Sequence, residues 1–196
     1  MISHILLDLG NVVVALNGTR LVRALHPDWP VEELQSRLLS LDFAAAFERG
    51  SIGQAEFARR AVQELHLDLT PEAFCSLFGS FVEGPYAGAD AWLGELKTRY
   101  RLGCLSNTNE LHMSKLPRDV GMMRHFNDCF LSHEIGFIKP EPAAYLHVLS
   151  SWNVEPANVL FLDDNSANVA AAARVGMQAH RVFGLAQAQA LCRALL

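Results

Sequence analysis

Short apolar runs alternate with stretches of helical spacing along most of this chain. Five such runs, near residues 5–9, 101–105, 129–132, 159–164 and 177–183, are typical of buried strands in a parallel sheet. Helical patterns follow the runs, at residues 89–100, 141–152 and 166–175 and after residue 183. Strands that alternate with helices predict an α/β fold, in which right-handed crossovers join one parallel strand to the next.

One long segment lacks this alternation. From Thr19 to about Gly84, apolar residues recur at helical spacing, and no strand pattern interrupts them. Ser51 and Thr70 are candidate helix N-caps, and Pro71 suits the first position of the helix that follows Thr70. The segment is therefore expected to fold as a bundle of helices inserted between the first strand and the rest of the sheet.

The chain thus divides into two expected parts. Residues 1–15 and 85–196 form the core around the sheet, and residues 16–84 form a small helical cap. A chain of 196 residues is long enough for one buried core with an accessory domain of this size.

Composition narrows the class of protein. Hydrophobic residues make up 51% of the chain and charged residues 19%, as in soluble globular proteins. A net charge of −5 without a basic run argues against nucleic acid as a partner. No apolar run reaches the ~18–20 residues of a membrane span, and no signal peptide is evident. The absence of such a run predicts no membrane partner. Because the four cysteines are scattered, with no CxxC pair, we expect a cytoplasmic protein.

Polar residues gather where the expected strands end. Asp8 ends the first run, and an aspartate in an apolar strand is costly to bury without a partner. Taken alone, Asp8 is either such a partnered group or an ordinary turn-capping residue. The ends of the other strands, or the loops after them, supply further polar groups: Ser106, Asn107, Lys139, Asp163 and Asp164. In an open parallel sheet these ends face one crevice, where ligands bind.

The types of these side chains indicate one kind of chemistry. Three carboxylates cannot share a crevice without a cation, and a set of oxygen ligands without His or Cys favours Mg²⁺. A hydroxyl, an amide, a lysine and the N–H groups of turns suit a phosphoryl group. A carboxylate that is free to attack that group would supply covalent catalysis.

Four ordered motifs carry a resemblance to a known family. They are Asp8-Leu9-Gly10-Asn11-Val12, Leu105-Ser106-Asn107, Ile138-Lys139-Pro140-Glu141-Pro142, and Asp163-Asp164-Asn165 with Asn168. Together they resemble the haloacid dehalogenase superfamily of aspartyl-phosphate phosphatases over the whole chain. The resemblance implies a Rossmann-like parallel sheet flanked by helices, with a small helical cap inserted after the first motif.

Two further stretches resemble one branch of that superfamily. They are Glu48-Arg49-Gly50-Ser51-Ile52 with Phe57, and Ser106-Asn107-Thr108-Asn109 with Leu111-His112. Both are similar to the branch that contains α-D-glucose-1-phosphate phosphatases. The N-terminal phosphatase domain of soluble epoxide hydrolases is a more distant likeness.

The resemblance also implies a role for each site residue. Asp8 would be the nucleophile, and Lys139 would neutralise charge on Asp8 and on the phosphate. Leu9, Ser106 and the backbone N–H of Asn107 would bind the phosphate, together with Lys139. Mg²⁺ would be held by Asp8, the Gly10 carbonyl and Asp164. Asp163 and Asn168 would lie behind these groups and orient the metal ligands or Lys139.

Gly10 departs from the general pattern of the superfamily. Most of its phosphatases carry a second aspartate at this position, which protonates the leaving alcohol and then activates water. Help of this kind is worth ~10²–10⁴-fold in rate. Water or a cap residue could take over the role, and Glu48 and His112 are candidates. Each also has an ordinary interpretation, as a charge at a helix end and as a surface histidine.

The sequence thus favours a Mg²⁺-dependent phosphatase that acts on a small phosphorylated metabolite, such as the sugar phosphate glucose 1-phosphate. The chain would work as a monomer or a homodimer. Two alternatives stay open at this point. One is a non-catalytic binding protein that kept the fold without the aspartate at position 10. The other is a 2-haloacid dehalogenase, which would need neither Mg²⁺ nor the pair Asp163-Asp164.

Overall fold

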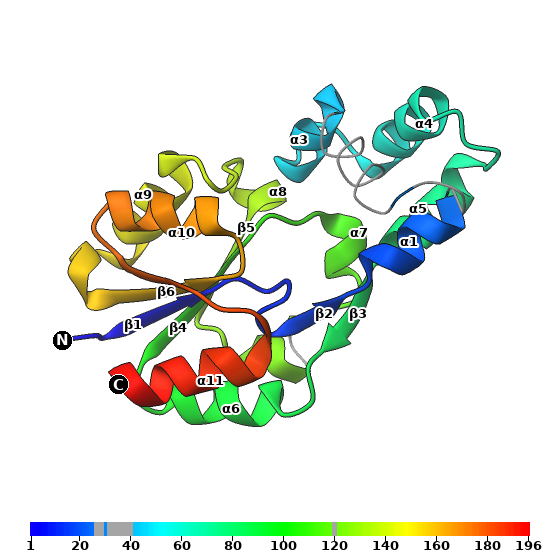
Figure 1. Ribbon diagram of the computed structural model, residues 1–196. Helices are drawn as coiled ribbons and strands as arrows, with labels where there is room; N and C mark the ends of the chain where they lie inside the picture. Colours follow the sequence, from blue (N-terminus) through cyan, green and yellow to red (C-terminus); the bar gives the residue numbers. More distant parts are fainter. Residues whose placement is uncertain (26–29, 31–40, 119–120) are drawn as a thin grey trace.

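A parallel sheet with helices on both faces forms the centre of the molecule (Figure 1). The computed structural model describes residues 1–25, 30, 41–118 and 121–196. In this part of the chain the main sheet has five strands in the order β5-β4-β1-β6-β7. Their bounds are β1 (His4–Leu7), β4 (Arg101–Ser106), β5 (Asp128–Leu131), β6 (Val159–Asp163) and β7 (Gln178–Arg181). All neighbours pair in parallel, as the alternation of strands and helices predicts.

Alternate residues of the central strand face opposite layers of the core. Ile5 and Leu7 of β1 pack into the cluster that includes α6 (Ala89–Lys97) and α11 (Gly184–Leu195). Leu6 packs into the other cluster, with α9 (Pro142–Trp152) and α10 (Ser166–Arg174). Figure 1 shows these two pairs of helices on opposite faces of the sheet. Because both faces are covered, the strands are apolar on both sides.

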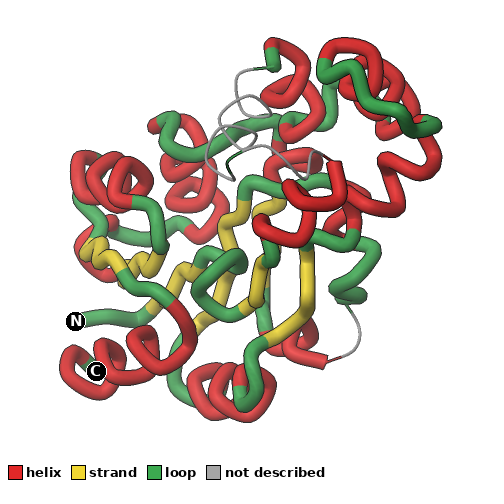
Figure 2. The backbone as a smooth tube through the Cα atoms, turned by 45° about the vertical axis from the view of Figure 1, so that its right-hand side comes forward, coloured by secondary structure: helices red, strands yellow, loops and turns green. Residues whose placement is uncertain are grey.

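The helical segment lies beyond one edge of this layered core (Figures 1 and 2). Its described helices are α1 (Gly18–Leu25), α3 (Asp42–Glu48), α4 (Gln54–Glu64) and α5 (Pro71–Gly79). They share a hydrophobic cluster of their own, in which Phe57 contacts the rings of Phe43, Phe47 and Phe74. The boundaries of the proposed cap, residues 16–84, and of the core, residues 1–15 and 85–196, remain predictions.

A narrow two-stranded ribbon leads into and out of the helical segment. Strand β2 (Val14–Leu16) pairs antiparallel with β3 (Val82–Pro85). The expectation that no strand occurs between Thr19 and Gly84 is therefore wrong at its C-terminal end. The four residues of β3 include a glycine and a proline, which hide its strand character in the sequence.

The helix caps match the sequence at one place and differ at another. Thr70 caps α5 by accepting a hydrogen bond from the Ala73 N–H, and Pro71 occupies the first turn, as predicted. By contrast, the N-cap of α4 is Gly53 and not Ser51, and no side chain caps this helix. The helical pattern expected over residues 26–29 and 31–40 lies outside the described residues.

Short elements complete the described chain. They are α7 (Glu110–Met113), α8 (Ser132–Ile135) and the 3-10 helices η1 (Gly121–His125) and η2 (Pro156–Asn158). Both α7 and α8 start at the carboxyl edge of the sheet: α7 follows a short loop after β4, and α8 follows β5 directly. Among the described helices, none has the length and apolarity needed to cross a bilayer.

Candidate active site

A cavity of about 170 Å³ opens at the carboxyl edge of the sheet, where the loops after β1, β4 and β6 meet. Seven of the residues singled out from the sequence line it: Asp8, Leu9, Gly10, Ser106, Asn107, Lys139 and Asp164. Asp163 and Asn168 lie next to it: Asp163 accepts a hydrogen bond from Lys139, and Asn168 donates one to Asp163. The structure therefore brings all nine residues into one place, although they come from distant parts of the chain.

Lys139 forms ion pairs with both Asp8 and Asp163. Its Nζ lies 2.8 Å from Asp8 Oδ1 and 2.7 Å from Asp163 Oδ2. The side chains of the three residues are nearly or fully enclosed, with exposed fractions of 2%, 11% and 0% for Lys139, Asp8 and Asp163. A buried charge is tolerated only when it is paired, and here one lysine serves two carboxylates.

Burial and neighbouring charges shift the pKa values of Asp8 and Lys139. Burial raises the pKa of Asp8 to about 6, and Lys139 opposes that rise while Asp163 adds to it. Burial alone would lower the pKa of Lys139, but the carboxylates of Asp8 and Asp163 outweigh burial and raise it. Lys139 is thus held as a cation, and Asp8 carries a charge that its surroundings only partly compensate.

The oxygens of Asp163 are already committed to protein partners. Oδ2 accepts from Lys139 Nζ, and Oδ1 accepts from the Asn165 N–H at 2.8 Å. The Asn168 amide donates to both oxygens, at 3.0 and 3.1 Å. This arrangement leaves Asp163 suited to fixing Lys139 in place and poorly suited to binding a metal ion directly.

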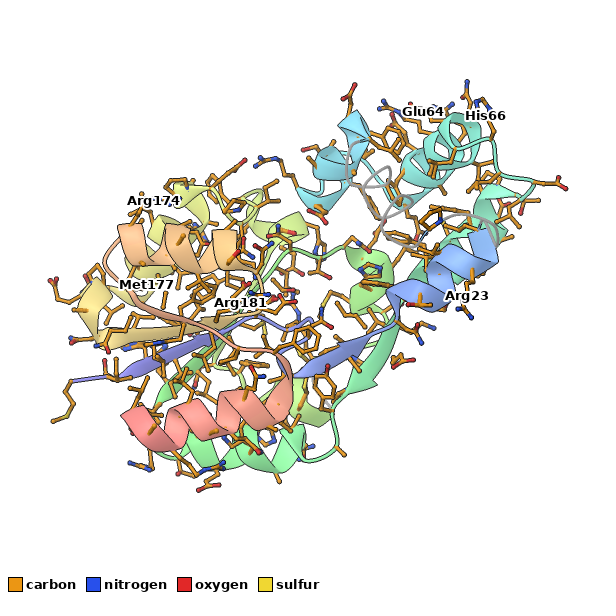
Figure 3. All side chains as sticks on the ribbon, in the orientation of Figure 1. Arg23, Glu64, His66, Arg174, Met177 and Arg181 are labelled. Atoms are coloured by element: carbon orange, nitrogen blue, oxygen red, sulfur yellow. The ribbon has the colours of Figure 1, made fainter. Side chains whose placement is uncertain are left out.

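Asp8 and Asp164 have oxygens that could hold a cation. Ligand atoms of Asp8, Asp163 and Asp164 lie within 4.8 Å of one another. Asn11 Nδ2 donates to Asp164 Oδ2 at 3.0 Å, and Arg181 Nε donates to the Asp164 carbonyl at 2.8 Å. Figure 3 shows Arg181 beside the end of β6. The donor set is all oxygen and carries net negative charge, which fits Mg²⁺.

The loop after β4 forms the opposite side of the cavity. Ser106 is buried at the strand end. The Asn107 amide donates to the Lys139 carbonyl and accepts from the Lys139 N–H, both at 2.8 Å. The Asn107 side chain therefore positions Lys139, and only its backbone is left to face a ligand.

Ser132 forms hydrogen bonds with the backbone of the loop after β4. Its hydroxyl accepts from the Thr108 N–H and donates to the Thr108 carbonyl, both at 2.9 Å. Asn109 then caps α7 by accepting from the His112 N–H at 3.1 Å. These bonds set the path of the chain from Ser106 into α7, so the loop has little freedom to move.

The side chain of Leu16 covers position 10. A Cβ added to Gly10 would lie 2.7 Å from Cδ1 of Leu16, which reaches over it from β2. Leu16 also lines the cavity. An aspartate at position 10 would therefore require the end of the Leu16 side chain to move.

The helical segment contributes the remaining wall. Glu48, at the end of α3, and Phe81, just before β3, line the cavity together with His112 of α7. Burial raises the pKa of Glu48, against the attraction of Lys139 and Arg49. Burial lowers the pKa of His112 to about 4, and its ring stacks on Phe78. Glu64 and His66, by contrast, lie at the far end of the helical segment (Figure 3).

Sequence reasoning missed several residues of this site. Asn109 could have been found as the N-cap of α7, because asparagine is a preferred residue at that position. Asn11 lies inside the first motif, but its bond to Asp164 crosses 153 positions of the chain. Ser132 and Leu16 act through contacts that depend on the packing of separate elements, and no local pattern marks them.

Comparisons with known proteins agree with this geometry. Residues 2–176 match the model of the haloacid dehalogenase-like hydrolase family. The chain is 28% identical to a D-ribitol-5-phosphate phosphatase of Bacteroides thetaiotaomicron over 191 residues, which cover 91% of this chain and 90% of the relative.

Solved structures share the whole architecture. A structure described as a predicted HAD-like family hydrolase from Porphyromonas gingivalis has a TM-score of 0.83 and 26% identity, and the match covers 100% of this chain and 98% of the other. A HAD family enzyme from Bacteroides thetaiotaomicron, solved with magnesium and inorganic phosphate, has a TM-score of 0.79 and 23% identity over 92% of this chain and 94% of its own. The second likeness supports the fold alone.

Proposed function

The chain belongs to the haloacid dehalogenase-like hydrolase family, and on this premise we propose that it is a Mg²⁺-dependent phosphatase. It removes the phosphoryl group from a small phosphorylated sugar or polyol and passes through a phosphorylated Asp8. The observation that carries the proposal is the arrangement at the sheet edge. There Asp8 is paired with Lys139 and lies beside Asp164, in a cavity that Ser106 and Asn107 close.

The residues present fit a magnesium ion. Asp8, Asp164 and the backbone carbonyl of Gly10 would hold it, because Asp163 is occupied by Lys139 and Asn168. A bound Mg²⁺ would neutralise charge on the phosphoryl group and on Asp8. The charges support this fit, since Lys139 alone faces the three carboxylates of Asp8, Asp163 and Asp164. Burial and the two neighbouring carboxylates also raise the pKa of Asp8, so a cation beside it would be stabilising.

The protein groups divide the work on the phosphoryl group. An oxygen of Asp8 attacks phosphorus, and the bond to the leaving alcohol breaks. Lys139, the Ser106 hydroxyl and the N–H groups of Leu9 and Asn107 bind the phosphoryl oxygens and stabilise the charge that develops on them. Water then attacks the same phosphorus, which releases phosphate and regenerates Asp8. Asp163 and Asn168 keep Lys139 in position throughout.

The substrate class follows from the size and lining of the cavity. A volume of about 170 Å³ has room for a phosphoryl group with a short chain of carbons. Thr108, Asn11 and Glu48 add polar groups that suit hydroxyls. A relative named for D-ribitol 5-phosphate supports an open-chain or cyclic polyol. Glucose 1-phosphate belongs to the same class and stays a candidate.

A panel of substrates tests the proposal. Phosphate release is measured with D-ribitol 5-phosphate, glucose 1-phosphate and acetyl phosphate, each with Mg²⁺ and with a chelator, for the wild type and Asp8→Asn. We expect release that needs Mg²⁺ and that falls by about 10⁴-fold or more in Asp8→Asn. Equal activity of the variant would contradict the assignment of Asp8 as the nucleophile.

The same panel separates the two alternatives. A non-catalytic binding protein would release no phosphate from any substrate, yet phosphate analogues would stabilise it in the presence of Mg²⁺. A 2-haloacid dehalogenase would release halide from chloroacetate and would keep that activity with the chelator. The acidic cluster of Asp8, Asp163 and Asp164 favours the phosphatase over the dehalogenase.

A further inference from the structure

Glu48 is a carboxyl group in the cavity that the steps above leave without a role. It lines the same cavity as Asp8 and Lys139 but comes from the helical segment, outside the cluster of Asp8, Asp163 and Asp164. Its side chain makes no hydrogen bond or ion pair with any residue that the structure describes. Burial raises its pKa, which favours the protonated form. A carboxyl group in this state can donate a proton.

The neighbours of Glu48 fix the end of α3 against the part of the core that follows β5. Arg49 Nη1 donates to Glu141 Oε2 at 2.9 Å and to the Gly136 carbonyl at 3.2 Å, and its second nitrogen also bonds Glu141. Gly50 approaches the core so closely that an added Cβ would lie 2.1 Å from the His133 carbonyl oxygen. The loop that receives Arg49, residues 136–141, is the loop that carries Lys139. Glu48 is therefore held next to the catalytic lysine.

The proposed reaction needs a proton donor in this cavity. The alcohol of a sugar or polyol is a poor leaving group as an alkoxide, so it must gain a proton as the bond to phosphorus breaks. Position 10 cannot supply the donor, because it is a glycine covered by Leu16. His112 shares the cavity, but burial lowers its pKa to about 4 and keeps the ring neutral, which makes it a weak acid.

We infer that Glu48 is the general acid and base of the proposed phosphatase, delivered to the site by the helical segment. The inference rests on the proposed function. In the first step Asp8 attacks phosphorus and the protonated Glu48 gives its proton to the departing alkoxide oxygen. In the second step the Glu48 carboxylate takes a proton from the water that attacks phosphorylated Asp8. Phosphate leaves, and both carboxyl groups return to their starting states.

Two substrates that differ in leaving group test this role. D-ribitol 5-phosphate releases an alcohol, whereas acetyl phosphate releases acetate, which needs no proton. In Glu48→Gln, which keeps the shape of the side chain, kcat/KM for the alcohol ester should fall by ~10²–10⁴-fold. For acetyl phosphate kcat/KM should change little, because it reports only the transfer to Asp8. Phosphorylated Asp8 should then accumulate, since the variant lacks the base for the second step.

Matched variants separate the loss of an acid at position 48 from a general loss of charge or of structure. Glu56→Gln makes the same chemical change at an exposed position of α4 and should leave both substrates unaffected. Glu48→Asp keeps the acid but withdraws it by one methylene group, so its loss on the alcohol ester should be smaller than that of Glu48→Gln. Thermal unfolding of each variant shows whether the fold is intact.

The outcomes are distinct. An equal loss on both substrates, or no loss on either, overturns the role of Glu48 and leaves the proposed function standing. If the wild type hydrolyses no member of the panel, the proposed function fails and the inference falls with it.

Discussion

The cavity has two walls that are held in place in different ways. The sheet wall consists of Asp8, Ser106, Asn107, Lys139 and Asp164, and the helical wall consists of Glu48 and Phe81. On the sheet side, Lys139 is bound by Asp8 and Asp163, and its backbone is bound twice by Asn107. On the helical side, Glu48 has no such partner among the described residues. That wall is joined to the core by polar contacts, such as the bond from the Gln54 N–H to Glu110 Oε1, and by the stacking of Phe78 on His112.

This difference indicates how the chemistry is divided. Groups that must meet the phosphoryl oxygens need fixed positions, and a parallel sheet supplies them because its strand ends converge on one edge. In the proposed mechanism, a group that meets the rest of the substrate comes from helices with their own hydrophobic core. Under the proposed mechanism, the sheet wall acts on the phosphoryl group and the helical wall acts on the leaving group.

The largest expected effect comes from breaking the sheet wall at Lys139. Lys139→Met would leave the buried Asp8 and Asp163 without their shared cation. We expect the unfolding free energy in metal-free buffer to fall by ~3–5 kcal/mol and kcat to fall by at least ~10²-fold. Urea unfolding and phosphate release measure the two effects.

Lys115→Met is the matched control for that experiment, because Lys115 is exposed and lies outside the cavity. It should change neither quantity. If Lys139→Met unfolds at the same urea concentration as the wild type, the buried ion pairs do not hold the sheet wall together.

A smaller effect should come from His112 of α7, which stacks on Phe78 of the helical segment, through the pH dependence of stability. Burial lowers the pKa of His112 to about 4, from 6.5 in the unfolded chain. The folded protein therefore binds fewer protons than the unfolded chain between these values. His112 contributes stability above pH 6.5, and that stability is lost as the pH falls toward 4. Between pH 7 and pH 5 its loss amounts to ~2 kcal/mol.

His112→Phe isolates this contribution. The phenyl ring can keep the stacking on Phe78 but cannot bind a proton. Unfolding free energies of the wild type and the variant at pH 5, 6 and 7 give two slopes. The wild type should lose more stability toward pH 5 than the variant, whatever the constant offset between them. Parallel curves would mean that His112 titrates normally and is not enclosed as described.

The sequence carried most of the information about the sheet wall. Runs of apolar residues between helical patterns predict the parallel strands, and parallel strands bring their carboxyl ends together. That rule alone predicts that Asp8, Lys139 and Asp164 share one crevice, and all three line the same cavity. The strength of the prediction comes from periodicity, which does not depend on distant contacts.

The contacts of the helical wall could not be predicted from the sequence in this way. The pair Arg49–Glu141 joins residues that are 92 positions apart, and nothing near either residue marks the contact. The ribbon of β2 and β3 pairs two strands of only three and four residues, which are too short to show an alternating pattern. The cover of Gly10 by Leu16 depends on that ribbon, so it could not be foreseen either.

The most direct test of the proposed mechanism is to trap the phosphorylated enzyme. Wild-type protein is mixed with excess D-ribitol 5-phosphate and Mg²⁺, quenched in acid during turnover, and digested for peptide mass spectrometry. The mechanism predicts that the peptide containing Asp8 gains the mass of one phosphoryl group, and that the peptide from Asp8→Asn does not. Steady turnover with the phosphoryl group on another residue, or on none, would contradict it.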